Sequence, residues 1–168
     1  SRGLGDVYKR QITQALLLAA DIPVFAGVGG GLTKGQRVVN LAMFAEMQGA
    51  TGVVLNAPTA NTVVQHVAET IDIPVVVTVA RADTDFDARL QAGANIFNVS
   101  AAAETPAIVR SIRERYPDVP IIATGGPTDE SILETIQAGA NAITWTPPSN
   151  GEIFRDIMAA YRDNKPHP

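Results

Sequence analysis

The chain has 168 residues, of which 46% are hydrophobic and 18% are charged, so it is long enough for one globular domain with a sizeable core. It contains no cysteine, which excludes disulfides, thiolate metal sites and cysteine nucleophiles. The formal charge is −4 and there is no basic block, which argues against a nucleic-acid partner. No apolar run approaches the roughly 18 residues that a membrane-spanning helix needs, so no membrane partner is predicted.

The first eleven residues, SRGLGDVYKRQ, stand apart from the rest of the chain. They resemble the in-frame translation of a transposase-type sequencing adapter. The resemblance implies that residues 1–11 are a non-native remnant, which fold reasoning should leave out. We therefore predict that one domain is formed by residues 12–168.

Six short apolar runs rich in β-branched residues alternate with amphipathic stretches of helical length. Near-continuous apolar runs of this length are typical of buried parallel strands, so the alternation predicts an α/β fold. Gly49, Gly93 and Gly139 suit the left-handed position that often follows a helix. The predicted strands are Val24–Ala26, Gly52–Asn56, Val75–Val79, Asn95–Val99, Ile121–Thr124 and Ala142–Thr146.

Three helix starts are predicted from capping patterns. Thr33 lies three residues before Gln36, and Ser149 three before Glu152, which is the spacing of a capping box. Thr105 precedes a proline that suits the first helical position, which predicts Thr105 as an N-cap.

An internal repeat sets the order of the strands. Three strands follow Asp-Ile-Pro or Asp-Val-Pro, beginning at Asp21, Asp72 and Asp118, and the other three follow Gly-Ala. The two types alternate strictly, so each repeat comprises two strand–helix units. Alternate strands supply alternate interior layers in a TIM (β/α)8 barrel. We therefore predict a partial TIM barrel containing strands three to eight, with the first two strand–helix units missing.

Polar side chains gather near the carboxyl ends of the predicted strands, at even-numbered positions, and the odd-numbered positions between them are apolar. Because side chains alternate along a strand, we expect the odd set to pack on the helices and the even set to line the barrel mouth, where TIM-barrel sites lie. The alternative is that these side chains merely complete the strand ends. The predicted lining residues are Asn56, Thr78, Asn98, Thr124, Thr144 and Thr146, with Ser100 just beyond.

The loops after the last two predicted strands favour the binding of an anion. Paired glycines, Gly125 and Gly126, precede a helix near Thr128, and helix N-termini attract negative charge. The strand ending in Thr-Gly-Gly resembles the phosphate-binding TIM-barrel superfamily, which includes thiamine-phosphate synthase, keto-deoxy-phosphogluconate aldolase and phosphosugar epimerases. Two ordinary turns are the alternative, and Pro147 and Pro148 lack the donors usual in that superfamily. The resemblance implies ligand binding by Gly125, Gly126, Ser149, Asn150 and Gly151.

Few titratable residues lie at this end of the strands. The candidate catalytic residues are Asp83, Asp85, Glu104 and, in the glycine-rich loop of residues 27–35, Lys34. The structural alternative makes Asp83 a helix N-cap, with Asp85 and Asp87 as favourable charges in the first turn. No His or carboxylate cluster has metal-ligand spacing, so no metal is predicted and the cofactor is unknown.

The segments FAGVGGGLTKGQRVVN, VVLNAPT and IIATGGPTDESI resemble a family of bacterial barrel proteins that carries a hydrolase label without assigned residues. The resemblance implies a cytoplasmic location. We expect an enzyme of lyase or isomerase type that acts on a small phosphorylated metabolite, with an anionic small molecule as partner and a homo-oligomer as a compatible state. The alternatives are a hydrolase that activates water with Asp83 or Glu104, a flavin-binding oxidoreductase, and a non-catalytic ligand-binding barrel.

Overall fold

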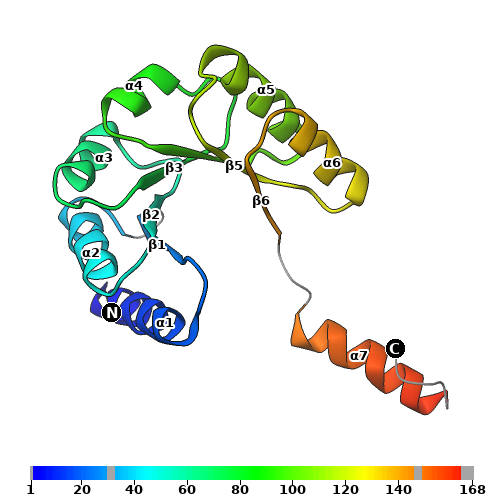
Figure 1. Ribbon diagram of the computed structural model, residues 1–168. Helices are drawn as coiled ribbons and strands as arrows, with labels where there is room; N and C mark the ends of the chain where they lie inside the picture. The colour runs from blue at the N-terminus through cyan, green and yellow to red at the C-terminus, as the bar shows by residue number, and fades with distance from the viewer. Residues whose placement is uncertain (1, 30–32, 146–148, 164–168) are drawn as a thin grey trace.

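Six parallel strands form a curled sheet with helices on its convex side in the computed structural model, which describes residues 2–29, 33–145 and 149–163 (Figure 1). The strands lie side by side in chain order, as in a TIM barrel, so the predicted partial barrel is confirmed. The strands are β1 (Phe25–Gly29), β2 (Gly52–Leu55), β3 (Val75–Val79), β4 (Ile96–Val99), β5 (Ile121–Thr124) and β6 (Ala142–Thr144). The helices are α1 (Arg2–Ala19), α2 (Gln36–Met47), α3 (Asn61–Ala68), α4 (Phe86–Gln91), a 3-10 turn at Ala102–Glu104, α5 (Thr105–Arg115), α6 (Asp129–Gln137) and α7 (Asn150–Arg162).

The two faces of the sheet follow the predicted alternation. Odd-numbered residues of the central strands, such as Leu55, Val77 and Phe97, are fully buried in the core between the sheet and the helices. Even-numbered residues, such as Thr78 and Asn98, are half-buried on the concave face and pair across β3 and β4. The apolar core therefore lies between the convex face of the sheet and the helices, and the polar residues lie on the concave face.

The first strand reverses this parity. Phe25 pairs with Gly52, an even position of β2, so Phe25 faces the concave side and is 39% exposed. Ala26 and Val28 take the buried positions instead.

The internal repeat corresponds to a recurring hydrogen bond. The residue after each Gly-Ala pair accepts a bond through its side-chain oxygen from the backbone N–H that follows each Pro. Thr51 Oγ1 accepts from Val24 N at 3.1 Å, and Asn95 Oδ1 accepts from Val75 N at 2.8 Å. The third bond joins Asn141 Oδ1 to the backbone N–H of Ile121, also at 2.8 Å. The same hydrogen bond thus links the starts of the two strands within each repeat.

The helix stops match the prediction, whereas two of the starts do not. Gly49, Gly93 and Gly139 have φ values of 88°, 100° and 110°, the left-handed conformation predicted for them. The expected capping box at Thr33 is absent, because Gly35 takes the N-cap position of α2 without a side-chain bond. Thr105 is the first residue of α5 rather than its N-cap, since the preceding 3-10 turn brings Glu104 into that position.

The ends of the chain differ from the middle. Helix α1 begins at Arg2, so the predicted boundary after residue 11 falls inside a helix, and the guanidinium of Arg10 lies 5.9 Å from the ring centre of Phe44. A non-native origin of residues 1–11 stays a prediction. At the other end, α7 stands apart from the sheet (Figure 1), and Trp145, expected to pack on helices, is 65% exposed. Thr146 lies outside the described residues.

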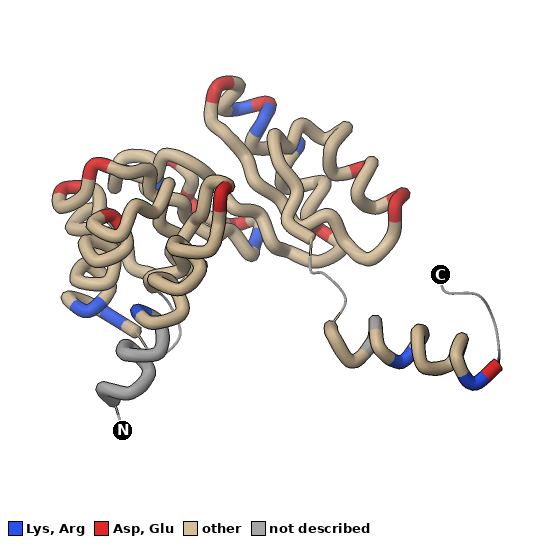
Figure 2. The backbone as a smooth tube through the Cα atoms, turned by 60° about the horizontal axis from the view of Figure 1, so that its bottom comes forward, with Lys and Arg blue, Asp and Glu red and all other residues tan. Residues whose placement is uncertain are grey.

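Basic and acidic residues are interspersed along the described chain. Figure 2 shows Lys and Arg positions spread among Asp and Glu positions over the described helices and loops. Among the described helices, none is both long and apolar enough to cross a membrane.

Candidate functional site

A row of polar side chains crosses the concave face of the sheet. Asn98 donates through Nδ2 to Thr78 Oγ1 at 3.3 Å, and Thr144 Oγ1 lies 3.3 Å from Thr124 Oγ1. Asn98 Oδ1 is buried and has no hydrogen-bond partner among the described atoms. A buried amide oxygen without a donor is rare in folded proteins, so this atom is available to accept a bond from a ligand.

Two further predicted residues stand at the strand ends. The backbone N–H of Asn56 donates to Gly29 O at 3.1 Å, and that of Ser100 donates to Val79 O at 2.8 Å. Both side chains are exposed on the loops that follow β2 and β4. The structure therefore places them at the same end of the sheet as Thr78 and Asn98.

The glycine pair after β5 forms one wall of a cavity of about 370 Å³ between the loops that follow β4 and β5. Gly126 has a φ of 78°, and a Cβ there would lie 2.6 Å from Ser131 Oγ, so only glycine fits. The cavity is lined by Ala102, Ala103, Pro106, Thr124, Gly125, Gly126, Pro127, Ser131, Glu134 and Thr135.

The N-terminus of α6 already has internal partners. Ser131 N donates to Thr128 Oγ1 at 3.3 Å, and Thr128 N donates to Ser131 Oγ at 3.1 Å, which completes a capping box. Gly125 N donates to Thr144 O at a long 3.4 Å. Glu134 also lines the cavity, and its negative charge opposes an anion there. Phosphate binding at Gly125 and Gly126 stays a prediction.

The second half of the predicted phosphate site lies elsewhere. Ser149 precedes α7, and Asn150 and Gly151 form its first turn. Because α7 stands apart from the sheet, its N-terminus does not meet that of α6 (Figure 1). Pro147 and Pro148 lie outside the described residues.

Asp83 forms an ion pair instead of the expected helix cap. Arg81 donates to it through Nε and a terminal nitrogen, each at 2.9 Å. This hydrogen bonding and the guanidinium charge hold the pKa of Asp83 below its usual range. A carboxylate with a lowered pKa is a weak general base, so Asp83 is poorly suited to activate water. Asp85 is the true N-cap of α4, because its side chain accepts from Ala88 N at 3.0 Å.

The remaining acidic candidates differ in their surroundings. Asp87 accepts bonds from the side chains of Arg115 and Tyr116, and burial together with the bond to Asp87 raises the pKa of the Tyr116 hydroxyl. Glu104 lines a smaller cavity of about 230 Å³ beside Phe86. Glu104 forms no ion pair with another described residue, which leaves it available as an acid or base.

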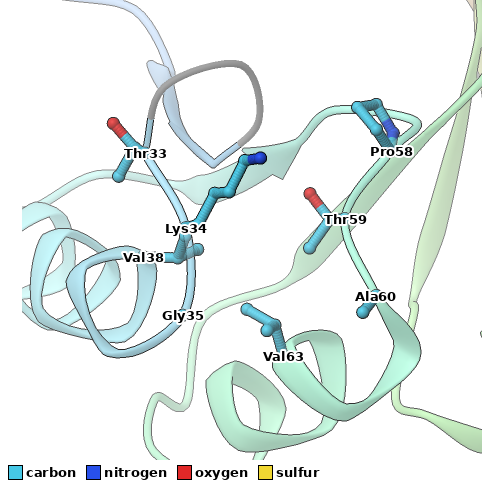
Figure 3. Close-up of a pocket in the computed structure, with 8 residues that line it drawn as sticks. All are labelled: Thr33, Lys34, Gly35, Val38, Pro58, Thr59, Ala60 and Val63. Atoms are coloured by element: carbon cyan, nitrogen blue, oxygen red, sulfur yellow. The ribbon is translucent and has the colours of Figure 1, made fainter.

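Lys34 lines another cavity, of about 340 Å³, at the carboxyl ends of β1 and β2 (Figure 3). Its side chain extends toward the loop that carries Pro58 and Thr59. Thr59 was missed by sequence reasoning, because a Thr just before a predicted helix is typical of a cap, whereas the N-cap of α3 is Ala60. The cavity is lined by Thr33, Lys34, Gly35, Val38, Pro58, Thr59, Ala60 and Val63.

Several solved structures with a similar fold are named as enzymes, and two of the three described below are named after a small acid. A protein described as a phosphonomutase from Burkholderia cenocepacia matches with a TM-score of 0.70 and 15% identity, over 95% of this chain and 76% of that one. A 2,3-dimethylmalate lyase of the PEP mutase/isocitrate lyase superfamily matches with a TM-score of 0.69 and 15% identity, over 94% and 67%. A phosphonopyruvate hydrolase bound to oxalate and Mg²⁺ matches with a TM-score of 0.65 and 16% identity, over 93% and 66%.

These identities are low, so the likeness establishes the TIM-barrel fold and nothing finer. No protein-family model matches the chain, and no curated protein matches it. One neighbour holds Mg²⁺, but within the described ranges of this chain no three His, Asp or Glu side chains gather closely enough to hold a metal ion.

Proposed function

We infer that the chain forms most of a TIM-barrel enzyme that binds a small anionic metabolite at the carboxyl ends of its strands. The observation that carries this inference is Asn98, whose buried Oδ1 lacks a partner while its amide nitrogen bonds Thr78. A concave polar row at this end of a barrel is where TIM-barrel enzymes hold their substrates. Two of the three fold neighbours support an acidic substrate, since their names contain the acids dimethylmalate and phosphonopyruvate.

The reaction we propose is of lyase or isomerase type on a phosphorylated metabolite. In such a site Asn98 would orient a hydroxyl or protonated group of the substrate, because its oxygen can only accept a bond. Glu104 would be the acid or base that moves a proton, since it has no ion-pair partner among the described residues. Gly125 and Gly126 would hold the anionic end through their own backbone N–H groups, since the donors at the start of α6 serve its capping box.

Hydrolysis is the second candidate, and the phosphonopyruvate hydrolase among the fold neighbours favours it. Of the two residues expected to activate water, Glu104 is the better suited, because the Arg81 pair lowers the basicity of Asp83. Exchange of a substrate proton with solvent before any bond cleavage would support the lyase or isomerase type, and release of inorganic phosphate would support hydrolysis.

Calorimetric titration of the chain with inorganic phosphate and with oxalate tests the binding step. We expect saturable binding of at least one of them. In Asn98→Leu the affinity for phosphate should fall about tenfold, because the variant lacks the acceptor for the phosphate hydroxyl, whereas oxalate has no proton to donate to Asn98 Oδ1. Asn40→Leu on the exposed face of α2 is the control and should bind as the unmodified chain does. Unchanged affinity in Asn98→Leu, with an unchanged melting temperature, would contradict the role given to Asn98.

A further inference from the structure

The cavity at the carboxyl ends of β1 and β2 combines one cation with apolar walls (Figure 3). Lys34 forms no ion pair with another described residue, and its side chain extends across the cavity toward Pro58 and Thr59. Val38 of α2 and Val63 of α3 form the apolar walls below. This lining suits a small molecule with one negative charge and an aliphatic body.

Two helix N-termini meet at the same cavity. Gly35 and Ala60, the N-caps of α2 and α3, both line it, and neither helix has a side-chain cap. The first N–H groups of a helix have no partner within the helix, and they carry the positive end of its dipole. Helix α6 differs from α2 and α3, because backbone N–H groups at its start already donate to the side chains of its capping box. Two uncapped helix starts and Lys34 thus place positive potential on one small volume.

Thr59 supplies an independent sign that something binds there. The residue is only 8% exposed, and its Oγ1 is buried without a hydrogen-bond partner among the described atoms. In Figure 3 the hydroxyl stands on the side of the loop that faces Lys34. A buried hydroxyl without a partner costs stability, so a ligand oxygen within reach would be stabilised by this donor.

The loop that carries Thr59 is held in place from behind. The guanidinium of Arg89 in α4 donates to Thr59 O at 2.5 Å, to Asn61 Oδ1 at 2.8 Å and to Ala57 O at 2.8 Å. Thr59 N also donates to Asn56 O at 3.0 Å. The loop backbone at Thr59 is therefore held in place before any ligand arrives, which lowers the entropic cost of binding.

We propose that this cavity is a binding site for a small aliphatic carboxylate, separate from the Asn98 site. The carboxylate oxygens accept bonds from the Lys34 ammonium, the Thr59 hydroxyl and the first N–H groups of α2 and α3, and the aliphatic body packs on Val38 and Val63. A carboxylate with an aliphatic body matches both the positive end of the cavity and its apolar walls, whereas inorganic phosphate has no apolar part to pack on Val38 and Val63. The β3 and β4 strands separate this cavity from the loop after β5, so the two sites can be tested apart.

Titration of the ¹⁵N-labelled chain with isobutyrate at constant ionic strength tests the proposal. We expect saturable shifts of the Gly35, Ala60 and Asn61 amides, no such shifts with neutral isobutyramide, and weaker binding of inorganic phosphate at the same amides. Lys34→Met should weaken isobutyrate binding about tenfold, the value of one charge-assisted bond. Arg110→Met, which removes an exposed charge from α5, is the matched control and should bind as before.

Thr59 gives a second, independent readout. Thr59→Val removes the unpartnered hydroxyl, so the ligand-free variant should melt at the same or a higher temperature while its affinity for isobutyrate falls severalfold, and Thr59→Ser should restore binding. Absence of saturable shifts at Gly35 and Ala60, or equal affinity in Lys34→Met and the unmodified chain, would overturn the proposal. Tighter binding of phosphate than of isobutyrate would overturn the carboxylate assignment. Isobutyrate shifts at Gly125 and Gly126 without shifts at Gly35 and Ala60 would also overturn the proposal, and would leave the proposed function standing.

Discussion

At the scale of single residues, the three aspartates around the start of α4 each have a different partner. Asp85 caps α4 and Asp87 bonds two side chains of the following helix, while Asp83 forms a two-pronged pair with Arg81. Their sequence pattern is the same, because each is an aspartate near a helix start. Only the three-dimensional partners distinguish them, which is why sequence reasoning assigned the cap to Asp83 instead of Asp85.

The Arg81–Asp83 pair leads to a prediction about pH. The pKa of the Asp83 carboxyl should lie below the usual aspartate value of about 3.9, and Arg81→Met should return it to that range. Because the folded-state pKa is lowered, the contribution to stability is complete above the unfolded-state pKa and is lost as pH falls through the folded-state value. An NMR titration of the carboxyl carbon measures this.

The same pair should matter little for stability near neutral pH. Both side chains are largely exposed, so solvent screens their attraction, and Arg81→Met should leave the melting temperature at pH 7 almost unchanged. A carboxyl pKa in Arg81→Met equal to that of the unmodified chain would show that the guanidinium does not hold Asp83.

At the scale of elements, the strands and the start of α6 at Thr128 were predicted closely, whereas the helix starts expected at Thr33 and Thr105 were not found there. Apolar β-branched runs leave few other conformations open to residues such as Val75–Val79, which form β3 as predicted. A cap depends on local geometry instead: Gly35, with a φ of 58°, sets the start of α2, so Thr33 cannot cap it. The polar row on the concave face could be predicted from the alternation of side chains along the strands. The cavity at Thr59 could not, because it depends on how the loops after β1 and β2 meet.

The recurring bond of the internal repeat leads to a prediction about stability. Asn95→Ala and Asn141→Ala each leave a strand-start N–H without its partner, so each should lower the free energy of unfolding by about 1–2 kcal/mol. Asn141→Ala should cost more, because Asn141 Oδ1 also accepts from Arg113 at 2.6 Å. Urea unfolding measures the difference.

Asn40→Ala provides the matched control, since Asn40 Oδ1 accepts only an exposed bond from Gln36. This variant should change stability by less than about 0.5 kcal/mol. Equal costs for Asn40→Ala and Asn141→Ala would mean that the repeat does not tie the strand starts together.

At the scale of the whole molecule, a six-stranded partial barrel presents its concave face and two sheet edges. Phe25 on β1 and Trp145 after β6 are exposed at those edges, and Phe154 and Tyr161 are exposed on α7. Exposed apolar side chains beside unpaired edges favour association with a second chain, so a homo-oligomer stays a prediction. The fold class was predictable because the repeat and the strand pattern agree, while the reaction was not, because a TIM barrel hosts many chemistries.

Amide-shift mapping with phosphonopyruvate tests whether the carboxyl ends of the strands bind a small anionic metabolite. We expect saturable shifts at residues 98–104 and 124–131, including the side-chain amide of Asn98. The loops at the opposite end, around Asp21, Asp72 and Asp118, should keep their positions in the spectrum. Shifts confined to those opposite loops, or none at either end up to millimolar ligand, would contradict the claim.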